Sequence, residues 1–586
     1  MSAFQQEQQS APNRFVQCVV TGLCVWVYLN TAPAMIEGEI VWIPMLALCL
    51  AAILGISLFT HGLMMLAYFF SWLSIHQDTG LEGTARWGEF KDIKPELSPK
   101  QSGPFWGMLL GKKRRPLFID YASNSMTVAP SGSGKGIYTV VVMGLSIRFG
   151  KVFSDFKGEL VCILKAALEK RGEIVRTLNP SGLWADIIGE SDSYNPIDII
   201  VDDLYRRDGL RDVADDLREY SAQISPEPAE QDSDDSYWRE GGRRIISDVT
   251  LLEAMIEGYD ASLASVALLI EDRKALEHNL RWVVGVDLKG QPLKDGAMPI
   301  EQAGWAQYHS EQDMAEFAAH VRARAGNLLA LMCAPDSKTF DSFIGTAQQA
   351  LAPYAFGRLA PAMRRSTFRM DDLKDPKQIT NLFIVADSSR METFKKYIGL
   401  IQWCAMTAMK RHDNKKQPVY FINDECTQYK VFGLEDLLTW GRSYSLRIHL
   451  IFQSLSAFEK TYGKSALQTL YSETEVKQFL PGQRSPKTLE LICQLLGKES
   501  LMNASMSMDK LEDGTNAQMN EKGRPLLTPD EIRRMWCGIL IVRQSAPLLI
   551  EPVSYGAVKP WRKQVGINPM HGKPFLQKVK LKLKNK

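Results

Sequence analysis

The chain has 586 residues and a formal net charge of +2, from 69 basic and 67 acidic side chains. This near balance excludes binding to nucleic acid through net charge alone, so any such contact must be local. The nine cysteines show no Cys-x-x-Cys spacing and the eight histidines form no ligand pattern, which predicts reduced thiols and no zinc site.

Two long apolar stretches, residues 15–35 and 41–66, lie near the start of the chain and are separated by Glu37-Gly38-Glu39. Each approaches or exceeds the roughly 20 residues that span a bilayer as a helix, so we expect a transmembrane hairpin within residues 1–80. A cleaved signal peptide is the alternative for the first stretch, but no small-residue cleavage site precedes the second. Basic residues outside the hairpin and glutamates inside it predict cytoplasmic termini.

The segment Ala129-Pro130-Ser131-Gly132-Ser133-Gly134-Lys135-Gly136 lies between an apolar run and a helix-compatible run at 137–147. Small residues let backbone N–H groups approach phosphate oxygens, and an ammonium can bridge the outer phosphates. The segment therefore predicts a nucleotide-binding P-loop formed by Ser131, Gly132, Ser133, Gly134, Lys135 and Gly136, with Lys135 supplying the charge. Ala129 replaces the usual first glycine, and Gly136 replaces the Ser or Thr that ordinarily binds magnesium. The alternative is a Gly/Ser turn between strand and helix.

Short β-rich runs follow and alternate with helical stretches, at residues 151–155, 173–177, 381–386, 419–422 and 447–452. This alternation predicts an α/β fold with a mostly parallel sheet. Between residues 197 and 335 helical periodicity replaces the strand signal, for example over 243–256 and 262–284. We therefore assign residues 81–196 and 336–558 to a nucleotide-binding domain and residues 197–335 to an inserted all-α domain.

Asp424 and Glu425 end the β-rich run Val419-Tyr420-Phe421-Ile422, which is a Walker B pattern. A carboxylate at a strand's carboxyl end can hold Mg²⁺, and its neighbour can orient and deprotonate the attacking water. We assign Asp424 to the metal and Glu425 to the water, while Gln453, at the end of the next apolar strand, could sense the γ-phosphate. The alternative is a solvated turn that carries two acids.

Two basic segments leave more than one interpretation open. Lys112-Lys113-Arg114-Arg115 follows the hairpin and is compatible with anionic headgroups or with a solvated loop. Residues 559–586 form a basic tail without acidic side chains, which favours polyanions such as nucleic acid or lipid, or simply keeps a terminus soluble.

Taken in order along the chain, several motifs resemble the coupling proteins of type IV secretion systems, the TraG/TraD-like membrane ATPases of conjugation. They are Gly83-Thr84-Ala85-Arg86-Trp87, Ala129 to Gly136, Asp155-Phe156-Lys157-Gly158-Glu159-Leu160, Asn195-Pro196, Asp424-Glu425, Gly441-Arg442 and Gln453. In that family a glycine at the position of Gly136 is a recognised variant. Phe156 departs from the family, which more often has proline there.

The resemblance implies a RecA-like P-loop ATPase that uses ATP and Mg²⁺, is stimulated by DNA, and forms a ring of six identical subunits in the bacterial inner membrane. It implies that Arg442 reaches the neighbouring subunit's phosphates, although a surface salt bridge is the alternative for this residue. The implied partners are single-stranded DNA with a relaxase or protein effectors, the secretion channel and inner-membrane lipids. Asp155 and Lys157 are expected behind the phosphates or at the subunit contact.

Two other functions remain open. A chromosome-type DNA translocase shares the membrane-anchored ring motor, but it usually has more spans and a winged-helix terminus. A receptor that binds nucleotide without turnover would fit the missing P-loop hydroxyl, whereas Glu425 and Arg442 favour hydrolysis.

Overall fold

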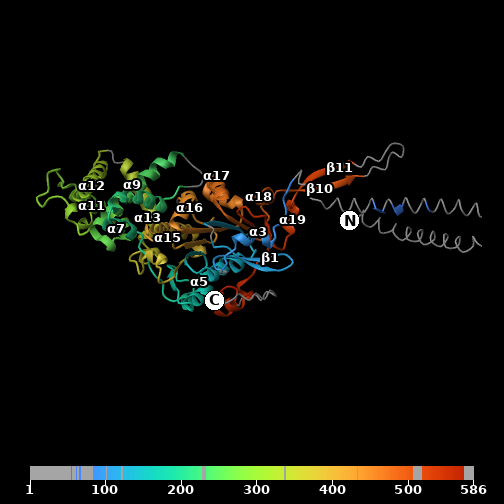
Figure 1. Cartoon of the computed structure of the whole chain (residues 1–586). Helices are drawn as coiled ribbons and strands as arrows, with labels where there is room; N and C mark the ends of the chain where they lie inside the picture. Colours follow the sequence, from blue (N-terminus) through green and yellow to red (C-terminus); the bar gives the residue numbers. More distant parts are fainter. Residues whose placement is uncertain are drawn as a thin grey trace, which may run out of the picture. The chain divides into compact units, whose positions relative to one another are not determined.

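The computed structural model describes residues 83–99, 102–120, 123–227, 233–335, 338–431, 433–505 and 518–572, with five more positions between 55 and 66. The chain divides into two compact units. The larger comprises residues 86–496 and 527–586, and the smaller comprises residues 1–85 and 497–526. Figure 1 labels the elements of both.

An eleven-stranded sheet is the framework of the larger unit. Its parallel part has the order β9 (Val476–Phe479), β3 (Asn124–Val128), β8 (Leu446–Phe452), β7 (Val419–Asn423), β4 (Gly150–Asp155), β6 (Thr380–Val385) and β5 (Ile174–Leu178). Every residue of β3, β4, β6 and β7 is buried, as is typical of parallel strands covered on both faces. The five strands expected from the sequence coincide with β4 to β8, so the α/β prediction is confirmed.

Four antiparallel strands extend the sheet beyond β9, in the order β12 (Gly538–Val542), β13 (Leu548–Glu551), β1 (Phe105–Leu109) and β2 (Arg115–Phe118). The sheet is therefore mixed, and the sequence did not predict this antiparallel part. Its strands are short and form two local hairpins, β1 with β2 and β12 with β13, which are joined where β1 pairs with β13 from the other end of the unit.

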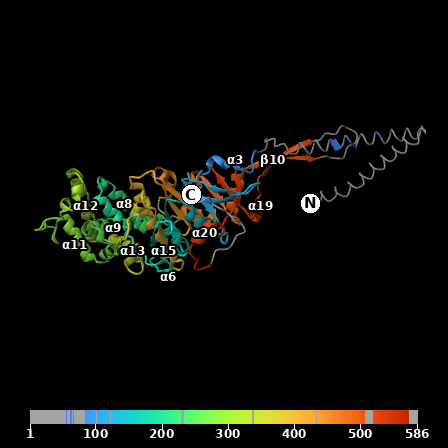
Figure 2. The same cartoon turned by 60° about the horizontal axis from the view of Figure 1, so that its bottom comes forward.

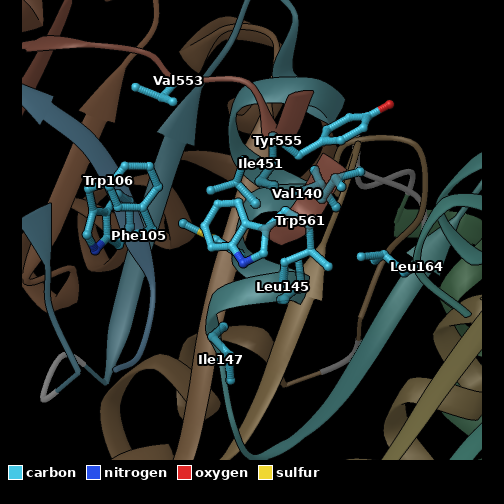
Figure 3. Packing of buried hydrophobic residues seen from close by; sticks show 14 of the residues in the cluster. Phe105, Trp106, Val140, Leu145, Ile147, Leu164, Ile451, Val553, Tyr555 and Trp561 are labelled. Atoms are coloured by element: carbon cyan, nitrogen blue, oxygen red, sulfur yellow. The ribbon is translucent and has the colours of Figure 1, made fainter. Parts of the chain in front are cut away.

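One hydrophobic core lies against helices next to the P-loop strand, where η2 (Gly136–Val140), α4 (Val141–Ser146) and α5 (Glu159–Glu169) supply side chains such as Leu145 and Leu164. The C-terminal helix α20 (Lys559–Gln564) adds Trp561, whose ring centroid lies 6.0 Å from that of Phe105 (Figure 3). Trp561 is buried. The first turn of the segment that we assigned to the basic tail is thus part of the core.

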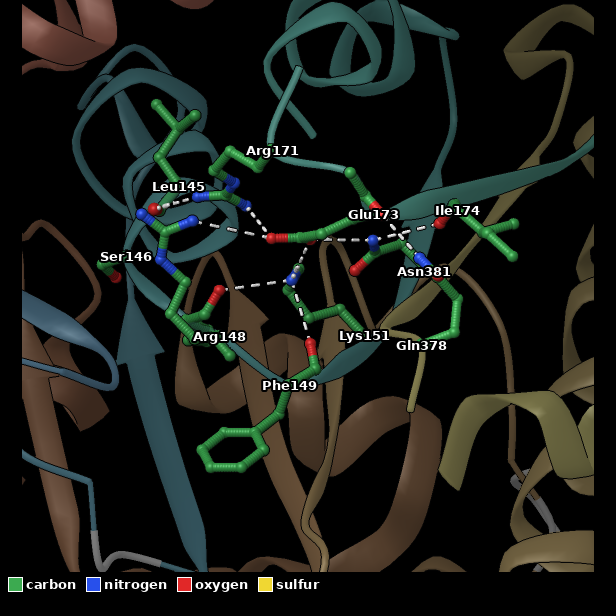
Figure 4. A network of polar contacts seen from close by, with 12 residues as sticks. Leu145, Ser146, Arg148, Phe149, Lys151, Arg171, Glu173, Ile174, Gln378 and Asn381 are labelled. Atoms are coloured by element: carbon green, nitrogen blue, oxygen red, sulfur yellow. Dashed lines mark hydrogen bonds and ion pairs between the residues drawn. The ribbon is translucent and has the colours of Figure 1, made fainter. Parts of the chain in front are cut away.

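A buried ion network joins β4 to β5 and β6 near their amino ends (Figure 4). Lys151 Nζ donates to Glu173 Oε2 at 3.2 Å and to the Phe149 carbonyl at 2.9 Å. Arg171 Nη2 lies 2.8 Å from Glu173 Oε1, and Asn381 Nδ2 donates to Glu173 Oε2 at 3.0 Å. Burial lowers the pKa of Lys151 to about 8. The shared carboxylate offsets the cost of burying these cations.

Helices without intervening strands occupy the described residues between Asp198 and Ala362. They are α7 (Asp198–Tyr205), α8 (Val213–Ile224), α9 (Ser233–Glu257), α10 (Leu263–Glu271), α11 (Arg273–Val284), α12 (Glu311–Met332), α13 (Lys338–Ala355) and α14 (Leu359–Ala362), with short 3₁₀ turns η3 (Gly209–Arg211), η4 (Gly258–Asp260), η5 (Ile300–Gln302) and η6 (Ala306–Tyr308). Figures 1 and 2 show α9, α11, α12 and α13 gathered together.

Two details of this helical region differ from the sequence expectation. The helix expected over 262–284 is broken between α10 and α11, because the side chain of Asp272 accepts hydrogen bonds from the backbone of Lys274 and Ala275 and so caps α11. The region also continues past residue 335, since α13 packs against α9 and α10.

Helix α15 (Met391–Arg411) is buried along most of its length, including Gln402 and Trp403. Such all-round burial is typical of a helix enclosed within a protein. The remaining helices of the larger unit are α3 (Phe90–Ile93), η1 (Lys94–Glu96), α6 (Ala185–Ile188), η7 (Met370–Lys374), η8 (Ser388–Arg390), α16 (Leu434–Trp440), η9 (Gly441–Tyr444), α17 (Leu455–Glu473), α18 (Pro486–Leu496), α19 (Pro529–Arg534) and η10 (Tyr555–Ala557).

The smaller unit contains the hairpin β10 (Lys498–Ser505) and β11 (Gln518–Pro525). Residues just after the expected transmembrane hairpin pair with it, since the Ala85 amide donates to the Lys498 carbonyl at 2.9 Å. The apolar stretches at 15–35 and 41–66 lie almost entirely outside the described residues. Among the helices that are described, none has the length and hydropathy needed to cross a membrane.

Candidate nucleotide site

The predicted P-loop connects β3 to η2 at the carboxyl edge of the parallel strands. Its base is held from both neighbouring strands: the Ala129 amide donates to the Phe452 carbonyl at 2.8 Å, and the Leu480 amide donates to the Val128 carbonyl at 3.0 Å. In the loop itself, the Ser133 amide donates to the Pro130 carbonyl at 3.0 Å. The loop is thus a closed turn leading into a helix.

Lys135 meets both predicted Walker B carboxylates. Its Nζ lies 2.6 Å from Glu425 Oε1 and 3.0 Å from Asp424 Oδ1. The three side chains are 17–27% exposed. They come together because β3, β8 and β7 are parallel neighbours and end at one edge of the sheet. The structure therefore brings Lys135 together with two neighbouring carboxylates that lie almost 300 positions away in the sequence.

The charges of this cluster depend on one another. Burial raises the pKa of Asp424, although the nearby Lys135 ammonium opposes that rise. Burial also acts to lower the pKa of Lys135, but the attraction of Asp424 and Glu425 outweighs it, so the pKa lies above its ordinary value. An ammonium between two carboxylates is a cation that the anionic phosphates of a nucleotide can share.

Two glycines give the loop its shape. Gly132 and Gly134 have φ of 80° and 79°, a region that favours glycine. A Cβ on Gly134 would lie 2.5 Å from Tyr138 Cε2, whereas a Cβ on Gly136 would meet nothing within 4 Å. Within the described part of the chain, the Gly134 and Lys135 amides donate to no other group. They are therefore available to phosphate oxygens.

The segment from Asp155 to Leu160 starts at the same edge, because β4 and β7 are parallel neighbours with Ser154 opposite Asn423. Asp155 Oδ2 accepts a hydrogen bond from the Val161 amide at 3.0 Å, which fastens the start of α5. Burial, with a contribution from the charge of Asp424, raises the pKa of Asp155 to about 7. Lys157 is exposed on the turn.

Gln453 and Arg442 lie at opposite ends of β8. Gln453 directly follows β8 beside the P-loop, and its side chain is exposed. Arg442 lies in η9 before β8, about 20 Å away if measured along the strand. It is 70% exposed and lies 3.9 Å from Glu475 Oε1. The structure does not bring Arg442 to the P-loop of its own chain, so a role at phosphate would have to be directed toward another subunit.

The residues fit a magnesium ion held mainly by nucleotide. Among the described residues, no group of three or more His, Cys, Asp or Glu side chains could hold a metal. Mg²⁺ typically takes one or two carboxylates and completes its shell with phosphates and water, so Asp424 alone suffices. The open space beside Gly136 could admit water where other P-loops provide a hydroxyl.

A cavity of about 750 Å³ lies elsewhere, between α7, η4 and the segment 365–371. Its lining includes Asp198, Asp202, Tyr259 and Arg369 and none of the predicted site residues. The candidate nucleotide site is therefore an edge of the sheet rather than this cavity.

A family of known proteins and several individual proteins resemble this chain over most of its length. A family model described as "Type IV secretory system Conjugative DNA transfer" matches residues 86–559. Protein VirD4 of Rhizobium rhizogenes is 23% identical over 507 residues, which cover 83% of this chain and 68% of that protein. The conjugal transfer protein TraG of Escherichia coli is 25% identical over 497 residues, covering 78% and 71% respectively. The chain spans 64–68% of the length of three VirD4 relatives.

Solved structures show the same fold. The bacterial conjugative coupling protein TrwBdeltaN70 in its unbound form superposes with a TM-score of 0.53 and 16% identity, covering 82% of this chain and 97% of that one. TrwB in complex with ADP and Mg²⁺ gives a TM-score of 0.52 and 17% identity, covering 80% and 94%.

Proposed function

Because the chain belongs to the type IV secretory system conjugative DNA transfer family, we propose that it is an ATPase coupling protein that recruits cargo and drives its transfer into a secretion channel. The observation that carries this proposal is Lys135 Nζ held between Glu425 Oε1 at 2.6 Å and Asp424 Oδ1 at 3.0 Å on the rim of a P-loop. TrwB, with the same fold, has been solved with ADP and Mg²⁺.

Each residue of the cluster has a defined task in this proposal. The loop amides bind the phosphates, and the Lys135 ammonium moves from the carboxylates to the outer phosphates. Asp424 is then free to orient Mg²⁺, which supplies charge neutralisation when bound. Glu425 orients the attacking water and accepts its proton. Gln453 lies at the same edge of the sheet, and in this proposal it contacts the γ-phosphate.

We extend the proposal to the assembly and its place in the cell. Six copies form a ring in which Arg442 of one subunit reaches the nucleotide of the next, where a guanidinium would neutralise transition-state charge. The exposure of Arg442 and its position at the far edge of the sheet support this role. The stretches at 15–35 and 41–66 anchor the ring in the bacterial inner membrane, with both termini and the ATPase body in the cytoplasm. The cargo is single-stranded DNA with its relaxase, or a protein effector.

The test is ATP turnover by the full-length protein, with and without single-stranded DNA, compared with Lys135→Ala. Turnover that DNA stimulates and Lys135→Ala abolishes supports a DNA-coupled motor. Turnover that DNA does not change would still support an ATPase and would favour a protein as the cargo. Turnover at the level of Lys135→Ala, in protein that binds nucleotide and forms rings, would instead favour a receptor without hydrolysis, the function that the missing hydroxyl at Gly136 allows.

A further inference from the structure

A buried polar cluster lies one residue behind the two acids at the edge of the sheet. Ser154 on β4 directly precedes Asp155, and Asn423 at the end of β7 directly precedes Asp424. Ser154 and Asn423 lie opposite each other in the parallel pairing of the two strands. Gln402 of α15 joins them: its Nε2 donates to Ser154 Oγ at 2.6 Å and to Asn423 Oδ1 at 2.5 Å. All three residues are at most 1% exposed.

Tyr429 completes the cluster from the loop that follows Glu425. Its hydroxyl donates to Asn423 Oδ1 at 3.0 Å and lies 2.8 Å from Ser154 Oγ. The centroid of its ring lies 5.7 Å from the centroid of the Phe156 ring. Phe156 is the position at which this chain departs from the family's usual proline, and here it packs on the tyrosine. Tyr429 therefore pins the loop to the ends of both strands.

The loop between Glu425 and Tyr429 is tightly constrained. Glu425 has φ of 50°, a left-handed conformation that a non-glycine residue adopts only when its surroundings hold it. The Cys426 amide donates to the Ile451 carbonyl at 3.1 Å, and the Tyr462 hydroxyl donates toward the carbonyls of Cys426 and Tyr429. A Cβ on Gly399 of α15 would lie 2.6 Å from the Lys430 carbonyl, so α15 packs directly against the loop.

We propose that Tyr429 and Gln402 are positioning residues for ATP hydrolysis, because they hold the strained turn that presents Glu425 to the attacking water. Among the described residues, no hydrogen bond or ring contact joins them to the phosphate loop or to the side chains of Asp424 and Glu425, so they act on the geometry of the turn rather than on nucleotide binding. This inference rests on the proposed ATPase function. Loosening the turn misplaces the base in the transition state, where small displacements are costly.

The kinetic test compares Tyr429→Phe and Gln402→Met with Tyr420→Phe in the full-length protein. Tyr420 is a matched control, because it is a buried tyrosine on β7 whose hydroxyl points to the other end of the strand, toward the Asp120 carbonyl at 3.5 Å. We expect kcat to fall about tenfold or more in both test variants, with the KM for ATP unchanged. The double variant should be no slower than the slower single variant, since the two act as one unit. Wild-type kcat in Tyr429→Phe overturns the inference, as does an equal loss in Tyr420→Phe.

A second measurement probes the local stability of the turn itself and does not depend on ATP hydrolysis. Hydrogen exchange of the peptide covering residues 424–429 should speed up in Tyr429→Phe and Gln402→Met but not in Tyr420→Phe, while peptides from β3 and β8 keep their protection. If exchange at 424–429 is unchanged in both test variants, the positioning role is wrong even in an active enzyme. A wild-type protein that does not hydrolyse ATP refutes the proposed function instead, and the exchange result still decides whether these residues hold the turn.

Discussion

Lys135 Nζ lies 2.6 Å from Glu425 Oε1, so the P-loop cation and the predicted catalytic base form an ion pair. The pair has two consequences. The carboxylate holds the ammonium at the loop rim, and we expect the ammonium to restrain Glu425 until phosphates draw Lys135 away. In the proposed function, binding of nucleotide and release of the base are therefore linked through one ion pair.

Glu425→Gln should separate binding from chemistry. The amide can still accept a hydrogen bond from Lys135, but it cannot take a proton from water. We expect kcat to fall by a factor of about 10² to 10⁴, the usual contribution of a general base, with affinity for ATP kept or increased. Single-turnover hydrolysis and equilibrium binding of ATP measure the two effects. Loss of binding in parallel with hydrolysis would argue against a role as base.

Gly134 and Gly136 should differ in their tolerance of a side chain. Gly134→Ala puts a methyl group 2.5 Å from Tyr138 at φ of 79°, so it should weaken ATP binding by a factor of about 10 or more, since strain at such positions costs about 1–3 kcal/mol. A Cβ at position 136 meets no atom within 4 Å, so Gly136→Ser should keep both binding and turnover. Binding titrations on the two variants check this, and equal losses would mean that the loop rearranges on binding.

Arg442 should act between subunits. Lys135→Ala and Arg442→Ala should each be inactive alone, because one lacks the loop cation and the other the arginine. Rings that contain both variants should regain part of the activity, since some sites combine an intact Lys135 with an intact Arg442 from the neighbouring subunit. Coexpression with separate affinity tags isolates such rings. Lys135→Ala mixed with Glu425→Gln is the matched control, because both residues belong to the same chain's half of the site and every site in such a ring still lacks one of them. Activity in the control equal to that in the test pair would contradict the assignment of Arg442.

Asp155 should make stability depend on pH. Its pKa is about 7 in the folded protein, raised first by burial, against about 3.9 in an unfolded chain. The folded state therefore holds the extra proton between these values, and stability from this group is lost as pH rises from about 4 to 7. Asp155→Asn removes the titration. Its midpoint of thermal unfolding should therefore rise relative to that of the wild type as the pH increases from about 4 to 7. The exposed Asp295→Asn is the control, and a constant difference between Asp155→Asn and wild type from pH 4 to 8 would refute the assignment.

The sequence predicted β4 to β8, helped by the clear boundaries of the apolar runs β4, β6, β7 and β8, but it did not predict the parallel strand β9. It did not predict β1, β2, β12 and β13, because these strands have only four or five residues each. The pairing that joins the β1–β2 and β12–β13 hairpins also links distant parts of the chain, with Met108 opposite Glu551. Helices α10 and α11 were merged for a different reason. Their periodicities run together, and only the cap at Asp272 separates them.

For the candidate site, parallel strand order explains why Lys135, Asp424 and Glu425 could be grouped from motifs alone. The contribution of Gln402 could not be predicted from motifs. Its partner Tyr429 lies 27 residues further along the chain, and the two side chains meet only when α15 packs under the sheet. The position of Arg442 at the opposite edge also follows from the strand order rather than from its motif. The catalytic roles themselves stay predictions.

The most direct test of the central claim is transfer of a DNA marker from donor cells in which this chain is replaced by Lys135→Ala. Wild-type cells and cells carrying Gly136→Ser are the positive controls, and immunoblots must show equal protein levels. We predict that transfer falls to the level of a deletion in Lys135→Ala and persists in Gly136→Ser. Transfer at wild-type frequency from the Lys135→Ala donor would contradict the proposal that ATP hydrolysis at this site drives cargo into the channel.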